Sequence, residues 1–455
     1  MKVNLIFPAI SGVGFDSYGK GMEESWISHG LCLISACVKK AGYDVNLIDL
    51  RRLKGWDNFE NEIKKSKPDA VGITMMSVDY NPALKCIDII KKINPDIKII
   101  VGGAHPSIAP DEIASIDKID HVIKGEGEIS FVKLLQKIEK NETPERLIEG
   151  EKPDIDEMPF ADRELFGNLE YPLPVEGFSP PFVTIIAGRG CLYNCSFCQP
   201  AERAIFGKKV RRRSVNNVIK ELIGLREKYN FKSMMIHDDC ITEDRDWVYD
   251  FCKKYRAEFN IPFACQSRAD IVCRNEDMIK EMVQSGLKLF FIGFESGNQR
   301  ILNFLRKGTK VEHNYKAAEM CRKYGIQIWA NYMMGVPTET KEEVMDTVRM
   351  IQKIKPDHYS PAFFTPHPGS DLFTYCEEHG LSLIKNHDSF RRNATECKIR
   401  GIDYEFLFNA LNESMGIHVP LIKASTVSKI KAKVRPFFNE HPKLKSIIKT
   451  MLGQG

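Results

Sequence analysis

The stretch that decides the fold is Gly188-Arg189-Gly190-Cys191-Leu192-Tyr193-Asn194-Cys195-Ser196-Phe197-Cys198. It places three cysteines at C-x3-C-x2-C spacing, shortly after the apolar strand pattern Phe182–Ile186. Soft thiolates at such spacing can bind one metal centre. Glycines at 188 and 190 allow the backbone to approach an inorganic cluster closely, and nearby amides can donate hydrogen bonds to its sulfides. The stretch therefore predicts a metal-binding loop.

The number of clustered cysteines favours one kind of metal centre. A structural zinc ion prefers four ligands in a closed tetrahedron, and only three cysteines lie together here. Three thiolates on a 4Fe–4S cluster leave one iron open to a substrate or cofactor. The alternatives are a zinc ion with a remote fourth ligand and three unligated thiols. We therefore expect an iron–sulfur cluster held by Cys191, Cys195 and Cys198.

The same stretch resembles the signature of the radical S-adenosylmethionine superfamily, C-x3-C-x-aromatic-C, with Phe197 as the aromatic residue. The resemblance implies that the open iron binds the amino and carboxylate groups of S-adenosylmethionine. It implies that one electron, from a donor such as flavodoxin or ferredoxin, cleaves this cofactor to a 5′-deoxyadenosyl radical. It also implies that Phe197 packs near the adenine.

Six strand patterns alternate with helix patterns between residues 181 and 385. They are Phe182–Ile186, Ser233–Ile236, Phe263–Gln266, Leu289–Phe294, Ile328–Met333 and Tyr359–Phe364. A complete eight-unit barrel typically needs about 250 residues. Six units in a shorter segment therefore predict an open, partial (β/α)6 barrel, and the resemblance implies the same fold.

Polar side chains follow several of these strands, where barrel enzymes place their sites. The resemblance puts Glu295 and Ser296 near the ribose or methionine part of the cofactor. Arg268 is a candidate for the cofactor carboxylate, with a structural salt bridge as the alternative. Asp239, in a D-D-C-I-T stretch, is a candidate for direct substrate or cofactor contact, with a cap or solvated loop as the alternative.

Two further motifs lie in this segment. Gly335–Thr340 resembles the family pattern G-x-P-G-E-T, but Thr338 replaces the second glycine, so the turn need not be the usual one. The basic run Arg211-Arg212-Arg213 precedes a helix pattern. Such a run is more often a phosphate or carboxylate clamp, or a solvated face, than a nucleic-acid site.

The first 140 residues predict a second kind of α/β domain. Apolar strand patterns at Val3–Phe7, Val45–Ile48, Ala70–Thr74 and Ile97–Val101 alternate with helix patterns. Mostly apolar strands separated by helices indicate a parallel sheet covered on both faces. We therefore expect an open, doubly wound, Rossmann-like domain that binds a ligand at the carboxyl ends of its strands.

The motif V-G-G-A-H-P at 101–106 is followed by K-G-E-G-E at 124–128. This combination ahead of the cysteine stretch resembles the cobalamin-binding domain of cobalamin-dependent radical enzymes. The resemblance implies a corrin over the sheet edge and a slot for its nucleotide tail, and the implied contact residues are Gly72, Ser77, Gly102, Gly103, His105, Gly125 and Glu126. The D-x-H-x-x-G motif that supplies a histidine to cobalt is missing. His105 is thus expected as a loop or phosphate-slot contact rather than a cobalt ligand. A corrin-free relic of the domain is the alternative.

The predicted domain order is a cobalamin-binding domain at 1–140, a linker at 141–180, the barrel at 181–385 and a helical, basic segment at 386–455. With three cofactors, the resemblance implies a radical C-methyltransferase, which moves a methyl group from methylcobalamin to an unactivated carbon of a small-molecule or lipid-like substrate. A radical cyclase, oxidoreductase or rearrangement enzyme is the alternative. A non-enzymatic corrinoid or zinc module is disfavoured by the strand-end motifs.

Composition sets the broad class. The chain has 455 residues, 43% hydrophobic and 28% charged, which is typical of a globular protein and excludes a disordered, collagenous or small disulfide-rich class. Thirteen cysteines, no leader-like opening and no run of 18 apolar residues predict a cytoplasmic protein with reduced thiols. The net charge of +4 disfavours a general nucleic-acid surface. Residues 421–455 carry eight Lys or Arg and one Glu, a net +7, which leaves peripheral contact with an anionic membrane as an alternative to a docked helix pair.

Overall fold

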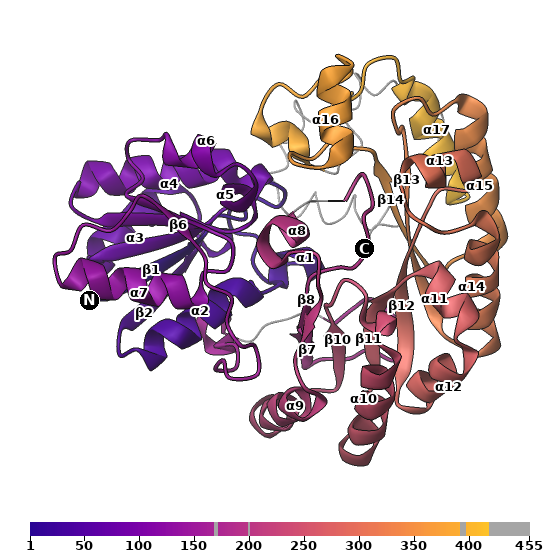
Figure 1. Ribbon diagram of the computed structural model, residues 1–455, viewed down its shortest axis with the longest axis horizontal. Coiled ribbons are helices and arrows are strands. Elements are labelled where there is room, and N and C mark those ends of the chain that lie inside the picture. The colour runs from indigo at the N-terminus through magenta and orange to yellow at the C-terminus, as the bar shows by residue number, and fades with distance from the viewer. Residues whose placement is uncertain (168–171, 199–200, 392–396, 418–455) are drawn as a thin grey trace, which may run out of the picture.

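The computed structural model describes residues 1–167, 172–198, 201–391 and 397–417. Two six-stranded parallel sheets dominate it, one in each half of the molecule (Figure 1). The first sheet and its helices lie on the left in this view, and the second sheet curves through the right half. The predicted combination of a doubly wound domain and a partial barrel is confirmed.

The first sheet has the strand order β2-β1-β3-β4-β5-β6. Its strands are β1 (Lys2–Phe7), β2 (Asp44–Asp49), β3 (Ala70–Thr74), β4 (Lys98–Gly102), β5 (His121–Lys124) and β6 (Leu147–Glu149). The order reverses direction at β1, and the carboxyl ends of β3, β4 and β5 meet at one edge. Such an edge is where open α/β sheets bind ligands.

Helices cover both faces of this sheet. One face packs on α3 (Trp56–Ser66) and α4 (Tyr80–Ile93), and the other packs on α2 (His29–Lys40) and α7 (Glu128–Glu139). Shorter elements fill the connections: α1 (Met22–Ser25), η1 (Leu50–Arg52), η2 (Ser77–Asp79), α5 (Ala104–Ile108), α6 (Pro110–Ala114) and η3 (Arg163–Phe166). Because both faces are buried, the central strands are almost wholly apolar, as the sequence predicts.

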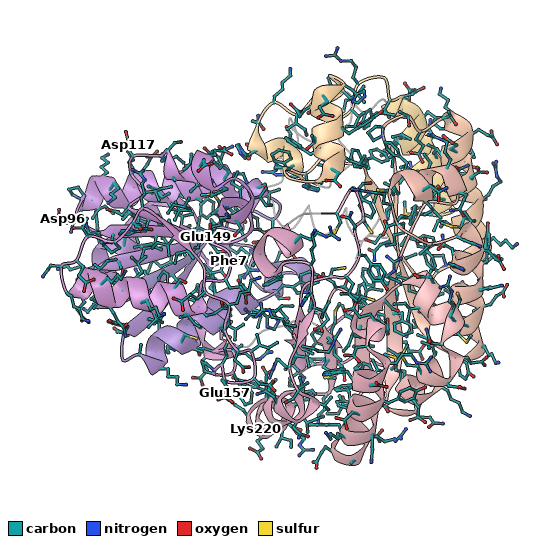
Figure 2. All side chains as sticks on the ribbon, in the orientation of Figure 1. Phe7, Asp96, Asp117, Glu149, Glu157 and Lys220 are labelled. Carbon is teal, nitrogen blue, oxygen red and sulfur yellow. The ribbon has the colours of Figure 1, made fainter. Side chains whose placement is uncertain are left out.

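The linker predicted at 141–180 contains ordered structure. Strand β6 lies inside it and pairs with β5, so the sheet itself extends to Glu149. Further along, Asp156 Oδ1 accepts a hydrogen bond from the backbone nitrogen of Ser214 at 2.8 Å. Figure 2 labels Glu157 of this linker and Lys220 on the same side of the molecule. The linker is thus attached to both halves, and the boundaries at 140 and 180 stay predictions.

The second sheet has the strand order β14-β13-β12-β11-β10-β7 and is parallel throughout. Its strands are β7 (Phe182–Ile185), β10 (Ser233–Ile236), β11 (Phe263–Ser267), β12 (Leu287–Glu295), β13 (Gln327–Met334) and β14 (His358–Phe363). All six predicted barrel strands are present, each shifted by no more than two residues at either end. A two-stranded antiparallel ribbon, β8 (Gly188–Arg189) with β9 (Arg211–Arg212), follows the first strand.

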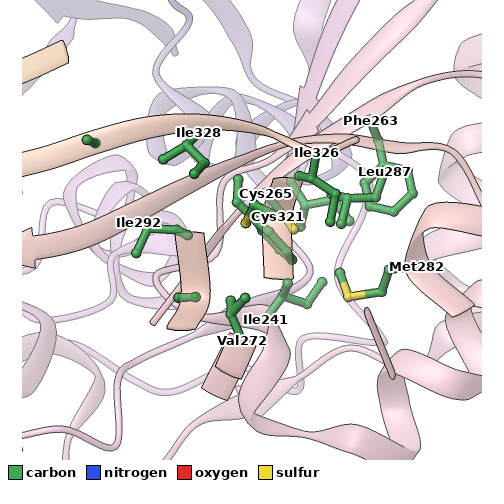
Figure 3. Close-up of a cluster of buried hydrophobic side chains, with 14 of the residues drawn as sticks. Ile241, Phe263, Cys265, Val272, Met282, Leu287, Ile292, Cys321, Ile326 and Ile328 are labelled. Atoms are coloured by element: carbon green, nitrogen blue, oxygen red, sulfur yellow. The ribbon is translucent and has the colours of Figure 1, made fainter. Parts of the chain in front are cut away.

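Helices line the outer side of the curved sheet (Figure 1). They are α9 (Val215–Tyr229), α10 (Arg245–Glu258), α11 (Ala269–Arg274), α12 (Glu276–Gln284), α14 (Val311–Lys323) and α15 (Lys341–Ile354), with α17 (Tyr404–Ser414) packed on α15. Figure 3 shows part of the core between sheet and helices, including Cys265 and Cys321. Cys265 is fully buried there, and Cys240 is also buried.

The carboxyl edge of the second sheet carries the remaining elements. These are α8 (Ala201–Phe206), η4 (Ile241–Glu243), α13 (Gln299–Phe304), α16 (Asp371–Glu378) and η5 (His387–Phe390). The predicted basic helix pair at 421–455 lies outside the described residues. Among the described helices, none is both long and apolar enough to cross a membrane.

Candidate active site

The cysteine loop connects β8 to α8 at the carboxyl edge of the second sheet. Ser196 fixes its centre, because its backbone nitrogen donates to Leu305 O at 2.9 Å and its carbonyl accepts from Leu372 N at 2.9 Å. Its hydroxyl donates to Phe304 O, also at 2.9 Å. The loop is therefore held by the end of α13 and the start of α16.

The backbone next to the first cysteine requires a glycine at position 190. Its φ is +96°, and a Cβ atom there would lie 2.9 Å from Lys209 O. A larger residue would strain the backbone and clash with the neighbouring main chain. The glycine therefore lets the chain turn directly into Cys191.

The three thiols are partly accessible rather than sealed. Cys191 and Cys195 are half-buried, and Cys198 is exposed. Three thiols on one loop are one fewer than a closed structural zinc site uses. They fit a 4Fe–4S cluster that keeps one iron open. Burial raises the pKa of the Cys191 thiol, so metal binding must displace its proton.

A buried ion pair lies beside this loop. Lys307 Nζ is 2.8 Å from Glu295 Oε1, and both side chains are about nine-tenths buried. Burial disfavours the charge of Lys307, but the Glu295 carboxylate outweighs this effect and raises the pKa of the lysine. The ammonium also lies 6.0 Å from the centre of the Phe197 ring. Glu295 is the last residue of β12, where the sequence predicted a contact with the cofactor.

Arg268 lies on the other side of the cysteine loop. Its guanidinium is 3.5 Å from the centre of the Tyr193 ring, a residue between the first two cysteines. It donates to Asp270 Oδ1 at 3.0 Å and to the Lys307 carbonyl at 2.6 Å. Arg268 therefore makes the salt bridge considered as its alternative role, and it also faces the cluster loop. Its contact with the cofactor carboxylate stays a prediction.

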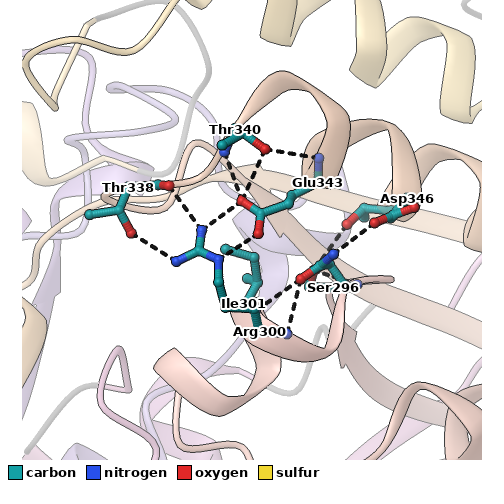
Figure 4. Close-up of polar contacts among 9 residues, drawn as sticks. Ser296, Arg300, Ile301, Thr338, Thr340, Glu343 and Asp346 are labelled. Atoms are coloured by element: carbon teal, nitrogen blue, oxygen red, sulfur yellow. Dashed lines mark hydrogen bonds and ion pairs between the residues drawn. The ribbon is translucent and has the colours of Figure 1, made fainter.

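Ser296 has surroundings different from those of Glu295, although the sequence placed both residues near the cofactor. It is fully buried, and its hydroxyl lies 3.1 Å from Thr347 Oγ1. The Asn298 backbone nitrogen donates to the same hydroxyl at 3.1 Å. Figure 4 shows Ser296 among the polar contacts between α13 and α15. These bonds shape the strand end, and the predicted cofactor contact of Ser296 is untested.

The two aspartates after β10 have separate environments. Asp238 is buried, accepts from Ala187 N at 2.7 Å and pairs with Arg212 at 3.0 Å. Asp239 is exposed on the side of the cysteine loop, where its charge raises the pKa of Cys191. The first aspartate therefore supports the loop, whereas the second remains a candidate for ligand contact.

The turn containing Thr338 keeps a left-handed backbone despite the loss of glycine. Its φ is +69°, and Arg300 donates to its carbonyl at 2.9 Å. Arg300 also pairs with Glu343, at 2.6 Å from Oε2, and Figure 4 shows the three residues together. The arginine thus stabilises a conformation that threonine alone disfavours.

Each arginine of the basic run pairs with a carboxylate of this chain. Arg211 contacts Glu126, Arg212 contacts Asp238 and Glu243, and Arg213 contacts Glu221. The basic run is therefore held in ion pairs within the chain.

A pocket opens at the carboxyl edge of the first sheet. It is mainly apolar and partly open to solvent. Its floor includes Gly72, Gly102, Gly103 and Gly125, and its walls include Leu31, Leu33, Ile34 and Phe131. Glycines at strand ends leave room for a flat ligand to approach the backbone. All four glycines among the seven predicted cobalamin contacts thus line one pocket.

The other three predicted contacts are placed differently. Glu126 borders the pocket, but its side chain is 1% exposed and pairs with Arg189 and Arg211. Ser77 and His105 lie outside the lining, with Ser77 Oγ 3.1 Å from His105 Nδ1. Their contact with a corrin is untested.

One short segment contributes to both sites. Arg189, Ile205 and Phe206 line the glycine pocket, and the three cysteines lie between them in the sequence. Helix α8, which follows the cysteine loop, packs against α5 of the first domain. Arg189 Nη2 is also 2.6 Å from Glu128 Oε1. The pocket and the cysteine loop are therefore adjacent across the junction of the two halves.

Sequence reasoning missed Lys307 and the pocket walls on α2 and α7. Lys307 lies in a loop before Gly308, far from any quoted motif. The prediction of Glu295 at a buried strand end implies that a cation lies nearby. The sequence does not indicate which lysine supplies that cation. The apolar wall residues look like ordinary core positions of an amphipathic helix.

The comparisons with known proteins agree with this geometry. Residues 22–135 match the B12 binding domain, and residues 185–351 match the Radical SAM superfamily. The chain is 30% identical over 382 residues to an uncharacterized methyltransferase of Pyrococcus horikoshii. The aligned region covers 78% of this chain and 80% of the relative. The chain belongs to the cobalamin-dependent radical S-adenosylmethionine enzymes.

Other relatives have different named activities. An anaerobic magnesium-protoporphyrin IX monomethyl ester cyclase of Rubrivivax gelatinosus is 25% identical, over 82% of this chain and 69% of its own length. Among solved structures, the radical methyltransferase TsrM of Kitasatospora setae with cobalamin and a [4Fe-4S] cluster has a TM-score of 0.69 at 14% identity. That match covers 92% of this chain and 91% of TsrM. This likeness shows the fold.

The protein is therefore an enzyme whose cofactors are a 4Fe–4S cluster, S-adenosylmethionine and cobalamin. The residues present fit this set. Three thiols on one loop leave a fourth ligand position open, and a mainly apolar, glycine-floored pocket can accept a large planar ligand.

Proposed function

We propose that the protein is a C-methyltransferase that methylates an unactivated carbon of a small molecule. The observation that carries this proposal is the segment from Arg189 to Phe206, which borders the cobalamin pocket at both ends and holds the cluster cysteines between them. A radical substrate and a methyl donor must meet in one cavity, and this segment joins the two cofactor sites.

When bound, the cluster with S-adenosylmethionine supplies a 5′-deoxyadenosyl radical, and the corrin supplies a methyl group. The chain itself positions the cofactors and supplies charged side chains around them. Lys307 and Arg268 are cations beside the cysteine loop, suited to a carboxylate. Glu295 is the matching anion, suited to an ammonium group or ribose hydroxyls. Phe197 offers an aromatic surface beside them.

Contacts between the two halves support the exclusion of water. The Arg189–Glu128 pair and the α5–α8 contact hold the halves together next to the glycine pocket. Closing of an active site protects a carbon radical from solvent and from side reactions.

The electron donor needs access to the cluster. Leu192, between the first two cysteines, is 55% exposed. An open hollow lined by Leu192, Lys209 and Arg245 lies beside it. This geometry supports reduction from that side by a small redox protein such as flavodoxin or ferredoxin.

The charge of the C-terminal stretch bears on the class of substrate. The net +7 of residues 421–455 supports an anionic or lipid-linked molecule, and with it peripheral contact with a membrane. A vesicle co-sedimentation assay of the full chain, with and without anionic lipid, tests that part separately.

The decisive experiment uses S-adenosylmethionine with a deuterated methyl group. The reconstituted enzyme is incubated with reductant and a fractionated small-molecule extract. We expect 5′-deoxyadenosine and S-adenosylhomocysteine in equal amounts, with the labelled methyl group in an acceptor. 5′-Deoxyadenosine formed without S-adenosylhomocysteine or labelled acceptor would contradict methyl transfer. That outcome would favour the cyclase or oxidoreductase alternative, which the relative from Rubrivivax gelatinosus keeps open.

A further inference from the structure

Two histidines and one glutamate come together beside the V-G-G-A-H-P motif of the first domain. His105 follows β4, Glu112 lies on α6, and His387 lies on η5 after the barrel. One ligand atom of each lies within 4.8 Å of the others. His105 and Glu112 belong to the first domain, whereas His387 arrives from the far end of the barrel.

The distances match a small coordination sphere. His105 Nε2 is 3.5 Å from Glu112 Oε2, and His387 Nε2 is 3.2 Å from Glu112 Oε1. Ligands about 2.0–2.1 Å from a tetrahedral zinc ion lie about 3.3–3.4 Å from one another. Imidazole nitrogens and a carboxylate are also the donor types that zinc accepts.

His105 is prepared as a ligand. Its side chain is 1% exposed, and its Nε2 atom has no hydrogen-bond partner in the described part of the chain. Its other nitrogen, Nδ1, lies 3.1 Å from Ser77 Oγ. A second-sphere bond at one ring nitrogen fixes the ring and leaves the other for metal. Burial lowers the pKa of His105, which favours the neutral, ligating form. A buried nitrogen without a partner is costly, and a cation would satisfy it.

His387 is held in place by stacking. Its ring is parallel to that of Tyr80, with the centroids 3.8 Å apart and an angle of 7° between the planes. Its centroid is 5.2 Å from that of His105, at a steep angle. The stack places the His387 ring with its Nε2 atom 3.2 Å from Glu112 Oε1.

We propose that His105, Glu112 and His387 form a binding site for one divalent cation of the zinc type, which joins the segment after the barrel to the first domain. Three protein ligands leave a fourth position for water or another donor. None of the three residues belongs to the cysteine loop or to the lining of the glycine pocket. Its metal would fix η5 against η2 and α4 of the first domain, with which η5 is in contact.

The test uses the full-length enzyme with its iron–sulfur cluster reconstituted, so that the cluster cysteines do not compete for zinc. Equilibrium dialysis against radioactive zinc is followed for the wild type and for Glu112→Gln and His387→Ala. We expect about one zinc per chain in the wild type and at least ~10-fold weaker binding in each variant. Iron and cobalt contents should stay unchanged, since neither residue lines a cofactor site.

Matched controls are available on neighbouring surfaces. Asp111→Asn alters the exposed acid next to Glu112 on the same helix, and His379→Ala removes an exposed histidine of α16. Both should bind zinc as the wild type does. A second readout is hydrogen exchange of residues 381–390, which zinc should slow in the wild type and in the controls only. Absent zinc binding in the wild type, or equal binding by all five proteins, overturns the proposal.

Discussion

Lys307 Nζ lies 2.8 Å from Glu295 Oε1 in a pair that is about nine-tenths buried beside the cysteine loop. Neither charge has water to replace its partner. Removing one member of a buried pair typically costs about 3–5 kcal/mol, because the other charge stays buried without compensation. Loss of either charge should therefore destabilise the fold, and the pair also lies where the cofactor is expected to bind.

Lys307→Met should lower both stability and S-adenosylmethionine cleavage. We expect a large fall in melting temperature from the uncompensated Glu295, together with at least ~10-fold slower formation of 5′-deoxyadenosine. The double variant Lys307→Met/Glu295→Gln removes both charges and should recover much of the stability but not the cleavage rate. Recovery of the cleavage rate in the double variant would show that the pair acts only in folding.

Cys198→Ala should abolish the cluster. Iron in the reconstituted protein should fall from about four per chain to well below that number, with loss of the broad visible absorption of the cluster and of 5′-deoxyadenosine. Cys273→Ala, which removes a half-buried thiol outside the loop, is the control and should keep its iron. Equal loss in both variants would count against the assignment of the loop.

The cluster cysteines and both sheets could be predicted because they depend on local patterns. Three cysteines lie within eight residues, and buried parallel strands are continuous apolar runs. The role of the arginine run could not be predicted, because Arg211 pairs with Glu126 from the other domain, 85 residues earlier. Pairing across such separations depends on how the domains dock. Strands β5 and β6 were not predicted, because runs of four and three residues are too short to recognise as strand patterns.

Gly102→Val should weaken cobalamin binding selectively. Gly102 lines the pocket, and a Cβ atom there meets only ordinary contacts, 3.6 Å from Ile123 O. The backbone therefore tolerates the change, while the side chain fills ligand space. Overpacking of about 1–3 kcal/mol corresponds to about 5- to 150-fold weaker binding. Cobalt per chain, measured at limiting cobalamin, should fall while iron stays near four. Gly224→Ala, in an open position on α9, should change neither metal.

Asp79 should make stability depend on pH. It is buried, Oδ2 has no hydrogen-bond partner in the described residues, and burial raises its pKa to about 7. Because the folded pKa exceeds the unfolded value, the folded state loses stability as the pH rises from about 4 to about 7. Asp79→Asn should therefore raise the melting temperature more at pH 8 than at pH 5. Asp117→Asn, at an exposed position labelled in Figure 2, should show no such difference. An equal effect of Asp79→Asn at both pH values would contradict the buried-carboxylate explanation.

Arg189 should couple the two cofactor sites. Its guanidinium contacts Glu126 and Glu128, whose side chains are 1% and 7% exposed, and it lies two residues before Cys191. Arg189→Leu leaves Glu128 without a cation, so the domain junction should loosen. We expect 5′-deoxyadenosine still to form, but with less labelled methyl product per molecule of it, because the substrate radical is quenched before methyl transfer.

The double variant Arg189→Leu/Glu128→Leu separates the coupling role from simple stability. It removes the orphaned carboxylate, so its melting temperature should return toward that of the wild type. If Arg189 positions the cysteine loop against the pocket, the ratio of methyl product to 5′-deoxyadenosine should stay low in the double variant. Arg226→Leu, which breaks a surface pair with Glu258, should leave this ratio unchanged. A restored ratio in the double variant would mean that Arg189 serves only to neutralise its acidic neighbours, and that other contacts between the halves, such as that of α5 with α8, keep the two cofactor sites aligned.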